Sequence, residues 1–308
     1  MRPTRYYGAN PDGWWCVPGA CNGVANGTVF VDAEMNLVGQ LGVHSLRLEF
    51  PWALMEPTGH GTYDWSRSDY IVNAANRDHV NLVPIIVFTP HWESAGLSDP
   101  PKGADFQSFA TALVARYKGS IHTWEMWNEP DLATYFSGTE AQYVSQVLVP
   151  GFNGVRAADP GARVVLGGPS GPNQSWLNSV YSLGGGQSFD IMAFHDYSSS
   201  GGQIIADAGL VLGVLQQHGQ GGKPVWLGEY GQQESAISDV GQQALLTAVV
   251  TGSSPIAMAQ WYNLRDDFSM LCCPPSVYKA AYWGLVQHDD STLKQGYGTL
   301  QQLIRQGY

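Results

Sequence analysis

The chain has 308 residues, of which 44% are hydrophobic, enough for a large core and a common length for a single barrel domain. Only 13% of the residues are charged and the formal net charge is -11, which argues against a nucleic acid or an anionic membrane as partner. No run of about 18 apolar residues occurs, so we expect no membrane-spanning helix. The composition is typical of a secreted monomer. No apolar segment follows Met1–Arg5, so a signal peptide would have been removed; a cytoplasmic protein is the alternative.

The four cysteines are too few for a disulfide scaffold and lack the two Cys-x-x-Cys pairs of a zinc site. They are Cys16, Cys21, Cys272 and Cys273, and three pairings are open to them. Their Gly/Pro-rich surroundings favour disulfides, with four reduced thiols as the alternative.

Short apolar runs alternate with helical patterns along the whole chain. We expect strands at 6–10, 44–50, 82–89, 123–129, 163–168, 189–195, 224–229 and 256–262. We expect helices at 29–41, 69–80, 105–117, 140–157, 175–183, 204–217, 238–250 and 293–304, the fourth bent or broken at Pro150. Eight strand–helix units of buried apolar strands predict an α/β fold, a single (β/α)8 TIM barrel over residues 1–308. A doubly wound open sheet is the alternative, but no Gly-x-Gly-x-x-Gly follows the first strand.

Two of these strands end in a glutamate. Thr123-Trp124-Glu125-Met126-Trp127-Asn128-Glu129 is stopped by Pro130, which cannot donate to a sheet ladder, and Val225-Trp226-Leu227-Gly228-Glu229 ends before Gly231. A lone glutamate at a strand end is most often a solvated loop group. In a parallel barrel, however, both would face the same mouth, and two carboxyl groups are what acid/base cleavage of an acetal requires.

Other polar and aromatic residues gather at the same strand ends. We expect them to bind substrate: Arg47, Trp52, His91, Trp92, Asn128, His195, Tyr197 and Trp261. Trp14 and Trp15 are further candidate platforms in a loop. Glu125 points the same way as Glu129 by strand parity, and we expect it to be the buried partner of Arg47. Either histidine could instead be a hydrogen-bonded core residue. No His-x-x-x-His or His-Glu-x-x-His occurs, so we expect no metal and no other cofactor.

These motifs together resemble the clan A glycoside hydrolases, retaining (β/α)8 enzymes of the family 39 or family 5 kind. The resemblance is carried by Trp-Glu-Met-Trp-Asn-Glu-Pro at 124–130, Leu-Gly-Glu-Tyr-Gly at 227–231, Phe-His-Asp-Tyr at 194–197 and Arg-Leu-Glu at 47–49. Tyr-Trp-Gly-Leu-Val at 282–286 is similar to the closing segment of these families. The usual Lys-Pro-Ala after the last strand is replaced here by Lys294-Gln295-Gly296, and the chain has no room for the extra β-rich domain of family 39 xylosidases.

The resemblance implies that Glu129 is the general acid/base and Glu229 the nucleophile. Arg47 and Tyr197 would then stabilise the Glu229 carboxylate, and Asn128 would bind the 2-hydroxyl of the sugar. Trp261 would form the floor of the sugar site.

The implied substrate is a carbohydrate, and the leading hypothesis is a retaining β-glycoside hydrolase that cuts poly- or oligosaccharides internally. The alternatives are an exo-acting β-glycosidase such as a xylosidase or glucosidase, a barrel that binds sugar without catalysis, and a metal-dependent hydrolase. The residues do not identify the sugar, because single hydroxyl contacts in the loops decide specificity.

Overall fold

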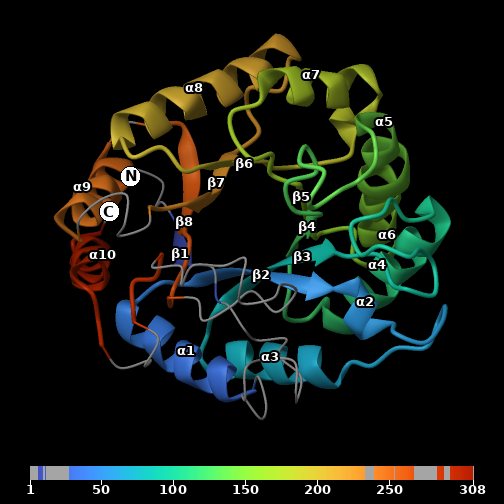
Figure 1. The fold of residues 1–308 in the computed structure, drawn as a ribbon, viewed down its shortest axis with the longest axis horizontal. Helices are drawn as coiled ribbons and strands as arrows, with labels where there is room; N and C mark the ends of the chain where they lie inside the picture. Colours follow the sequence, from blue (N-terminus) through green and yellow to red (C-terminus); the bar gives the residue numbers. More distant parts are fainter. Residues whose placement is uncertain are drawn as a thin grey trace.

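The computed structural model describes residues 6–9, 11, 28–232, 239–252, 254–266, 283–287 and 292–307. The four cysteines, Trp14 and Trp15 lie outside the described residues. Eight parallel strands form one sheet that curls into a barrel, with the helices outside it (Figure 1). The strands are β1 (Tyr6–Ala9), β2 (Ser45–Pro51), β3 (Asn81–Val87), β4 (Thr123–Met126), β5 (Arg163–Leu166), β6 (Met192–Asp196), β7 (Val225–Tyr230) and β8 (Ile256–Trp261).

The order of the strands is that of a closed barrel. The hydrogen-bonded neighbours run β5-β4-β3-β2-β1-β8-β7-β6. A parallel bridge between Val165 and Ile191 joins the two outer strands, with Leu166 N donating to Ile191 O at 3.0 Å. The predicted (β/α)8 TIM barrel is therefore confirmed, and all carboxyl ends of the strands point to one mouth.

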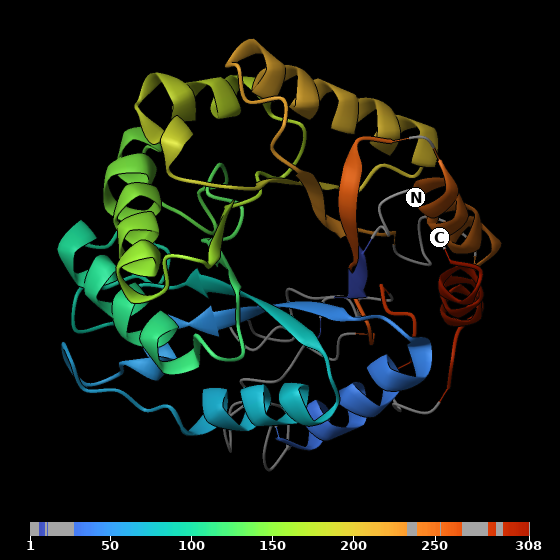
Figure 2. The same cartoon turned by 180° about the vertical axis from the view of Figure 1, so that it is seen from behind.

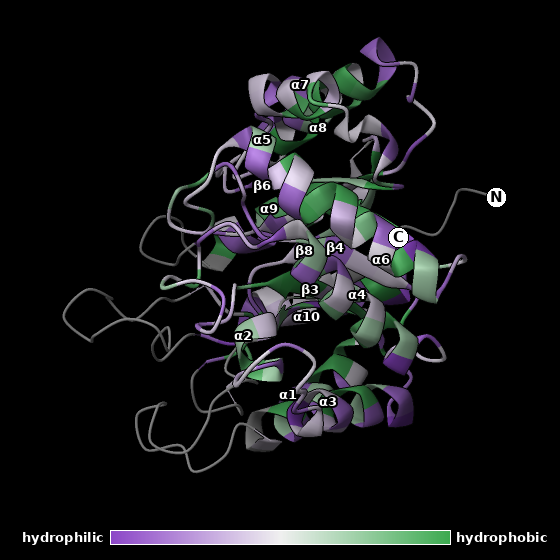
Figure 3. Ribbon diagram, turned by 90° about the vertical axis from the view of Figure 1, so that its right-hand side faces the viewer, coloured by the Kyte–Doolittle hydropathy of each residue, from purple (hydrophilic) through white to green (hydrophobic). Residues whose placement is uncertain are grey.

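The helices surround the strands, as the view from behind also shows (Figure 2). They are α1 (Thr28–Leu41), α2 (Trp52–Met55), α3 (Ser66–Arg77), α4 (Gly103–Tyr117), α5 (Glu140–Gln142), α6 (Val149–Ala158), α7 (Gln174–Ser182), α8 (Gly201–Gln217), α9 (Asp239–Thr251) and α10 (Gln295–Arg305). Hydrophobic and hydrophilic residues alternate along them, as expected for helices with one face on a sheet (Figure 3). Among the described residues, no helix is both long and apolar enough to cross a membrane.

Two apolar layers hold the barrel together. A large layer lies between strands and helices and includes Trp124, Met126 and Phe194. A second, small cluster lies inside the barrel, where side chains from strands on different sides of the sheet meet. It consists of Val83, Val165, Ile191, Ala193, Trp226 and Met258. This plug fills the barrel below its mouth.

Each predicted strand and helix is present, but some boundaries differ. Helix α3 begins and ends three residues before the predicted range, because His79 adopts a left-handed conformation (φ +57°) and turns the chain into β3. Helix α2 was not predicted. The helical run is not broken at Pro150. A π-helical segment, Tyr143–Leu148, precedes α6, and Pro150 lies in the first turn of α6, where its missing N–H is tolerated.

Candidate active site

The two predicted catalytic glutamates meet at the barrel mouth. Glu129 follows β4 and Glu229 lies in β7, 100 positions later, and the two are 7% and 9% exposed. One carboxylate oxygen of each and a ring nitrogen of His195 all lie within 4.8 Å of one another. Retaining glycosidases hold their carboxyl groups about 5–5.5 Å apart, and inverting ones about 6.5–9.5 Å apart to admit a water. The spacing therefore fits double displacement.

His195 lies between the two carboxylates. It is fully buried on β6, and its Nδ1 is 2.9 Å from Oε1 of Glu129 and 3.5 Å from Oε2 of Glu229. Two glycines lie close to the ring. A Cβ atom on Gly168 would lie 2.9 Å from Nε2 of the ring, and one on Gly228 would lie 3.2 Å from it. A Cβ atom at position 168 would therefore displace the ring, whereas one at position 228 would need the ring to give by a few tenths of an ångström.

Glu229 is held as an anion. Its Oε1 accepts a hydrogen bond from Arg47 at 2.7 Å, and its Oε2 accepts one from the hydroxyl of Tyr197. Burial alone would raise the pKa of Glu229, but His195, the Arg47 charge and these two hydrogen bonds outweigh it and lower the pKa below its usual value. An ionised carboxylate at the acidic side of neutrality is what a nucleophile needs.

Arg47 connects three side chains at the bottom of the site. It donates to both oxygens of Glu125, at 2.7 and 2.9 Å, and to Oδ1 of Asn128 at 2.8 Å, besides its bond to Glu229. Burial would lower the pKa of Arg47, but the two carboxylates raise it, so the side chain stays a cation. The predicted structural role of Glu125 is confirmed. Because the Asn128 oxygen is taken by Arg47, its NH2 group remains as the donor for a substrate hydroxyl.

The backbone around Glu129 is strained into position. Trp127 has φ +75° and Glu129 φ +39°, both in the left-handed region that side chains other than glycine rarely adopt. Glu129 N donates to Gly168 O at 3.1 Å, which ties the strand end to the chain following β5. A Cβ atom on Gly167 would lie 2.4 Å from Met126 O, so the two strand ends approach closely. This arrangement resembles the stored strain common at active sites.

A sequence model of the cellulase family, glycosyl hydrolase family 5, matches residues 31–264. The chain belongs to glycosyl hydrolase family 5.

Two curated relatives are named as xylanases. The chain is 34% identical over 86 residues to "Endo-1,4-beta-xylanase C" of Paenibacillus barcinonensis, an alignment that covers 24% of this chain and 8% of that protein. It is 26% identical over 149 residues to "Endo-1,4-beta-xylanase" of Agaricus bisporus, covering 43% of each. The matches thus span less than half the length of either relative.

Solved structures share the fold at low identity. A GH39 enzyme from Xanthomonas axonopodis pv. citri superposes with a TM-score of 0.78 at 17% identity, covering 99% of this chain and 66% of that one. A GH5_18 protein from Streptomyces cattleya gives 0.75 at 14% identity, covering 100% and 81%. These likenesses show the barrel fold, in agreement with the expected relation to families 39 and 5 of clan A.

The aromatic residues predicted as sugar platforms in this family 5 chain lie in different surroundings. Trp52 is fully buried, and its ring stacks on Phe109 with 5.4 Å between centroids. Trp261 is also fully buried, with its ring edge-on to Tyr230 at 5.1 Å. Neither ring has an exposed face in this structure, and stacking of a sugar on either stays a prediction. For Trp261 strand parity decides the burial, because a residue at a strand end faces either the mouth or the helices. Trp52 instead opens helix α2 and packs on Phe109 of α4.

The two residues predicted to bind substrate after β3, His91 and Trp92, contact backbone oxygens of loop residues. Trp92 is half-buried and donates through its indole N–H to Glu56 O at 2.6 Å. His91 is exposed, and its Nδ1 lies 3.2 Å from Ala95 O in its own loop. Contact of these two residues with substrate stays a prediction, since the described contacts link them to neighbouring loop residues rather than to the two glutamates.

Three site residues were missed by the sequence analysis, and all surround Tyr197. The rings of Tyr262 and Trp283 stand edge-on to it, with centroids 6.1 and 5.0 Å away, and both are half-buried. The side-chain amide of Gln232 donates to the backbone oxygen of Tyr197. Tyr262 directly follows Trp261 and so has the opposite parity on β8. Trp283 lies in the Tyr-Trp-Gly-Leu-Val segment at 282–286 that resembles the family's closing segment, whereas no local signal marks Gln232.

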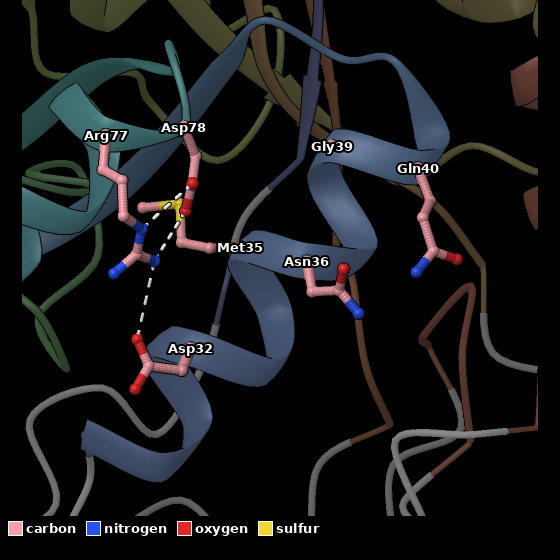
Figure 4. A pocket seen from close by; sticks show the side chains of 7 residues that line it. All are labelled: Asp32, Met35, Asn36, Gly39, Gln40, Arg77 and Asp78. Carbon is pink, nitrogen blue, oxygen red and sulfur yellow. Dashed lines mark hydrogen bonds and ion pairs between the residues drawn. The ribbon is translucent and has the colours of Figure 1, made fainter.

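A separate pocket of about 450 Å³ lies on the outer surface between α1 and the end of α3 (Figure 4). Its charged side chains are already paired. Arg77 bonds Asp78 at 2.7 Å and lies 3.6 Å from Asp32, which also accepts a hydrogen bond from Tyr70 at 2.5 Å. The pocket is outside the barrel wall and does not belong to the catalytic site.

Proposed function

We propose that this chain is a retaining β-glycoside hydrolase that cleaves a β-linked poly- or oligosaccharide by double displacement. The observation that carries the proposal is that one carboxylate oxygen of Glu129 lies within 4.8 Å of one of Glu229. Among the described residues, Arg47 and Tyr197 both donate hydrogen bonds to Glu229 and not to Glu129. This asymmetry assigns the roles. Glu229 attacks the anomeric carbon as an anion, while Glu129 donates a proton to the leaving oxygen and then activates water.

Asn128 is the group best placed to recognise the reacting sugar. Its amide oxygen is fixed by Arg47, so the NH2 group donates to a hydroxyl next to the anomeric carbon, a bond that strengthens in the oxocarbenium-like transition state. Tyr262 and Trp283 are half-buried aromatic rings beside Tyr197 and offer apolar faces to the sugar ring.

We infer that cleavage is internal and that xylan is the first substrate to test. The two curated relatives are both named as endo-1,4-β-xylanases, which supports this choice. An exo-acting β-glycosidase is the second candidate, because a solved structure of similar fold is described as a β-xylosidase from Caulobacter crescentus and another as a glucosidase from Croceicoccus marinus. Products from a ladder of β-1,4-xylo-oligosaccharides separate the two: mixed shorter oligosaccharides support internal cleavage, and release of single sugars only would exclude it.

A barrel that binds sugar without cleaving it is the alternative from another class. Turnover of β-linked aryl glycosides, together with a screen of xylan, glucans, mannan and arabinan, tests for catalysis directly. We expect Glu129→Gln and Glu229→Gln each to abolish turnover while the folded barrel is kept, as judged by circular dichroism. Equal rates in wild type and both variants would overturn the assignment.

We also propose that the protein is secreted and monomeric and that its cysteines form disulfides. The low content of charged residues supports secretion. Counting free thiols under denaturing conditions tests the disulfides, and the mass in solution tests the monomer.

A further inference from the structure

The turn that carries Glu129 lies beside the chain that follows β5. The parallel pairing of β4 with β5 reaches as far as Met126 and Leu166. Beyond it, Glu129 N donates to Gly168 O at 3.1 Å, and Leu132 N donates to Glu129 O at 2.9 Å. Glu129 itself has φ +39°, a conformation that costs free energy and persists only where the surrounding structure enforces it.

The hydroxyl of Tyr143 bridges the two segments on their buried side. It donates to Met126 O at 3.0 Å and accepts a hydrogen bond from Gly167 N at 3.1 Å. The side chain is fully buried, and burial raises the pKa of Tyr143, so the hydroxyl keeps its proton. One hydroxyl group therefore joins the last residue of β4 to the first residue after β5.

The surroundings of Tyr143 fix the place of its hydroxyl. The residue opens the π-helical segment Tyr143–Leu148 directly after α5, whose start is fixed by a capping box. Its ring lies edge-on to Phe136, with 6.0 Å between centroids, and is tilted against Trp176 at 5.3 Å. Segments of π-helix are rare overall and are found frequently at functional sites.

Asp131 bridges the same two segments on the solvent side, where Ser170 and Asn173 are exposed. Its carboxylate accepts hydrogen bonds from Ser170 N at 3.0 Å, from Ser170 Oγ at 3.2 Å and from Asn173 Nδ2 at 3.2 Å. Oδ1 of Asn173 accepts a hydrogen bond from Trp176 N at 3.2 Å, which ties this bridge to the start of α7. The turn is therefore fastened to the chain after β5 both before and after Glu129.

We propose that Tyr143 and Asp131 are positioning residues for the general acid/base. By joining the segments after β4 and β5, they hold Glu129 in its left-handed turn, so that its carboxyl group lies beside that of Glu229. Both act through the backbone, because the hydrogen bonds described for them involve chain neighbours of Glu129 and residues after β5. The effect on catalysis rests on the proposed function, whereas the two bridges do not.

Leaving groups of different acidity separate a misplaced acid/base from a general loss of structure. A dinitrophenolate departs without needing a proton, whereas the departure of a phenolate is helped by a proton from Glu129. For both substrates, kcat/KM reports on the steps up to the first displacement. A displaced Glu129 should therefore slow cleavage of a phenyl glycoside and leave cleavage of a dinitrophenyl glycoside nearly unchanged.

The test uses phenyl and dinitrophenyl β-xylobiosides, or the same glycosides of another sugar if the substrate screen identifies one. We expect Tyr143→Phe to lose about tenfold in kcat/KM on the phenyl glycoside and at most about twofold on the dinitrophenyl glycoside, because a small displacement of a reacting group is costly. Asp131→Ala, which removes no fully buried side chain, should show the same pattern. Asp131→Asn keeps an acceptor oxygen for Ser170 N and should show a weaker one. Equal losses on both substrates, or none on either, in Tyr143→Phe or Asp131→Ala would overturn the positioning role of the residue replaced.

Tyr181→Phe is the matched control. Tyr181 is a half-buried tyrosine of α7 whose hydroxyl donates to Gln220 Oε1 at 2.9 Å. Gln220 precedes β7 and so lies at the end of the barrel opposite to the mouth. This variant also loses one hydrogen-bonded hydroxyl, but it should keep the wild-type ratio of the two kcat/KM values.

Hydrogen exchange followed by mass spectrometry tests the bridges without any activity. We expect faster exchange than in the wild type in peptides covering 126–132 and 166–171 of Tyr143→Phe, because Gly167 N loses its acceptor and the turn loosens, and wild-type exchange there in Tyr181→Phe. Unchanged exchange in both segments of Tyr143→Phe would overturn its bridge whether or not the protein cleaves a glycoside. Faster exchange in a protein that cleaves no glycoside would support the bridge and overturn only the role in catalysis.

Discussion

Replacing Glu125 tests how the site is held together. Its side chain is 1% exposed and accepts two hydrogen bonds from Arg47, at 2.7 and 2.9 Å. Breaking a buried ion pair by removing one partner costs about 3–5 kcal/mol. Arg47 keeps its bond to Glu229, but its buried Nε and Nη2 groups lose Glu125 as acceptor. For a chain of this size one kcal/mol lowers the melting temperature by roughly 2 °C, so we expect Glu125→Ala to melt about 6–10 °C below wild type. Glu125→Gln keeps one acceptor oxygen and should lose about half as much.

The assay is thermal unfolding followed by circular dichroism near neutral pH, with Glu140→Ala as control. Glu140 is exposed in the first turn of α5, and its replacement should change stability by about 0.5 kcal/mol or less. A Glu125→Ala protein that melts together with the control would refute the view that this carboxylate neutralises Arg47.

Four further predictions concern Glu229, Tyr197 and metal dependence. Glu229→Ala should lose about a thousandfold or more in kcat, and azide should restore turnover with an inverted glycosyl azide as product; no rescue in the folded variant would count against its role as nucleophile. Tyr197→Phe removes a hydrogen bond that lowers the pKa of Glu229, so the acid limb of kcat/KM should move to higher pH, and an unchanged limb would contradict this. Because the pKa of Glu229 is lowered on folding, its ionised form stabilises the folded state above the usual glutamate pKa, and this stabilisation is lost as pH falls through the lowered pKa. Tyr197→Phe should therefore also reduce the stability that the wild type keeps at acidic pH. Melting curves between about pH 3 and 6 measure this difference. A chelator should leave activity unchanged, and its loss would favour a metal-dependent reaction.

The barrel could be predicted because its determinants are local and repeated. Each strand is a short apolar run followed by an amphipathic stretch, and eight such units leave few topologies. What failed were features set by single residues, such as the left-handed His79 that ends α3 early and the short helix α2. Both depend on how the chain packs against the barrel after the strands have formed.

The catalytic pair and its support were also predictable, for a different reason. Parity along β4 put Glu125 and Glu129 on one side, and a buried charge requires a partner, which led to Arg47. The aromatic residues that would stack on the sugar were harder to predict from the sequence. Trp261 and Tyr262 are adjacent, and a bulge in the pairing of β7 with β8 shifts the register of the strands. The sequence therefore does not show which of the two rings faces the mouth, and the predicted one, Trp261, is buried in the structure. The strained backbone at Trp127 and Glu129 left no mark in the sequence.

The stereochemistry of the first product tests the central claim most directly. Proton NMR, recorded within minutes of adding enzyme to a β-linked substrate that it cleaves, shows the anomer released before mutarotation. Since the Glu129 and Glu229 carboxylates lie within 4.8 Å at their nearest ligand atoms, we expect the β-anomer first, the result of two successive displacements. Initial release of the α-anomer would mean that water attacks directly, and would contradict the assignment of Glu229 as nucleophile.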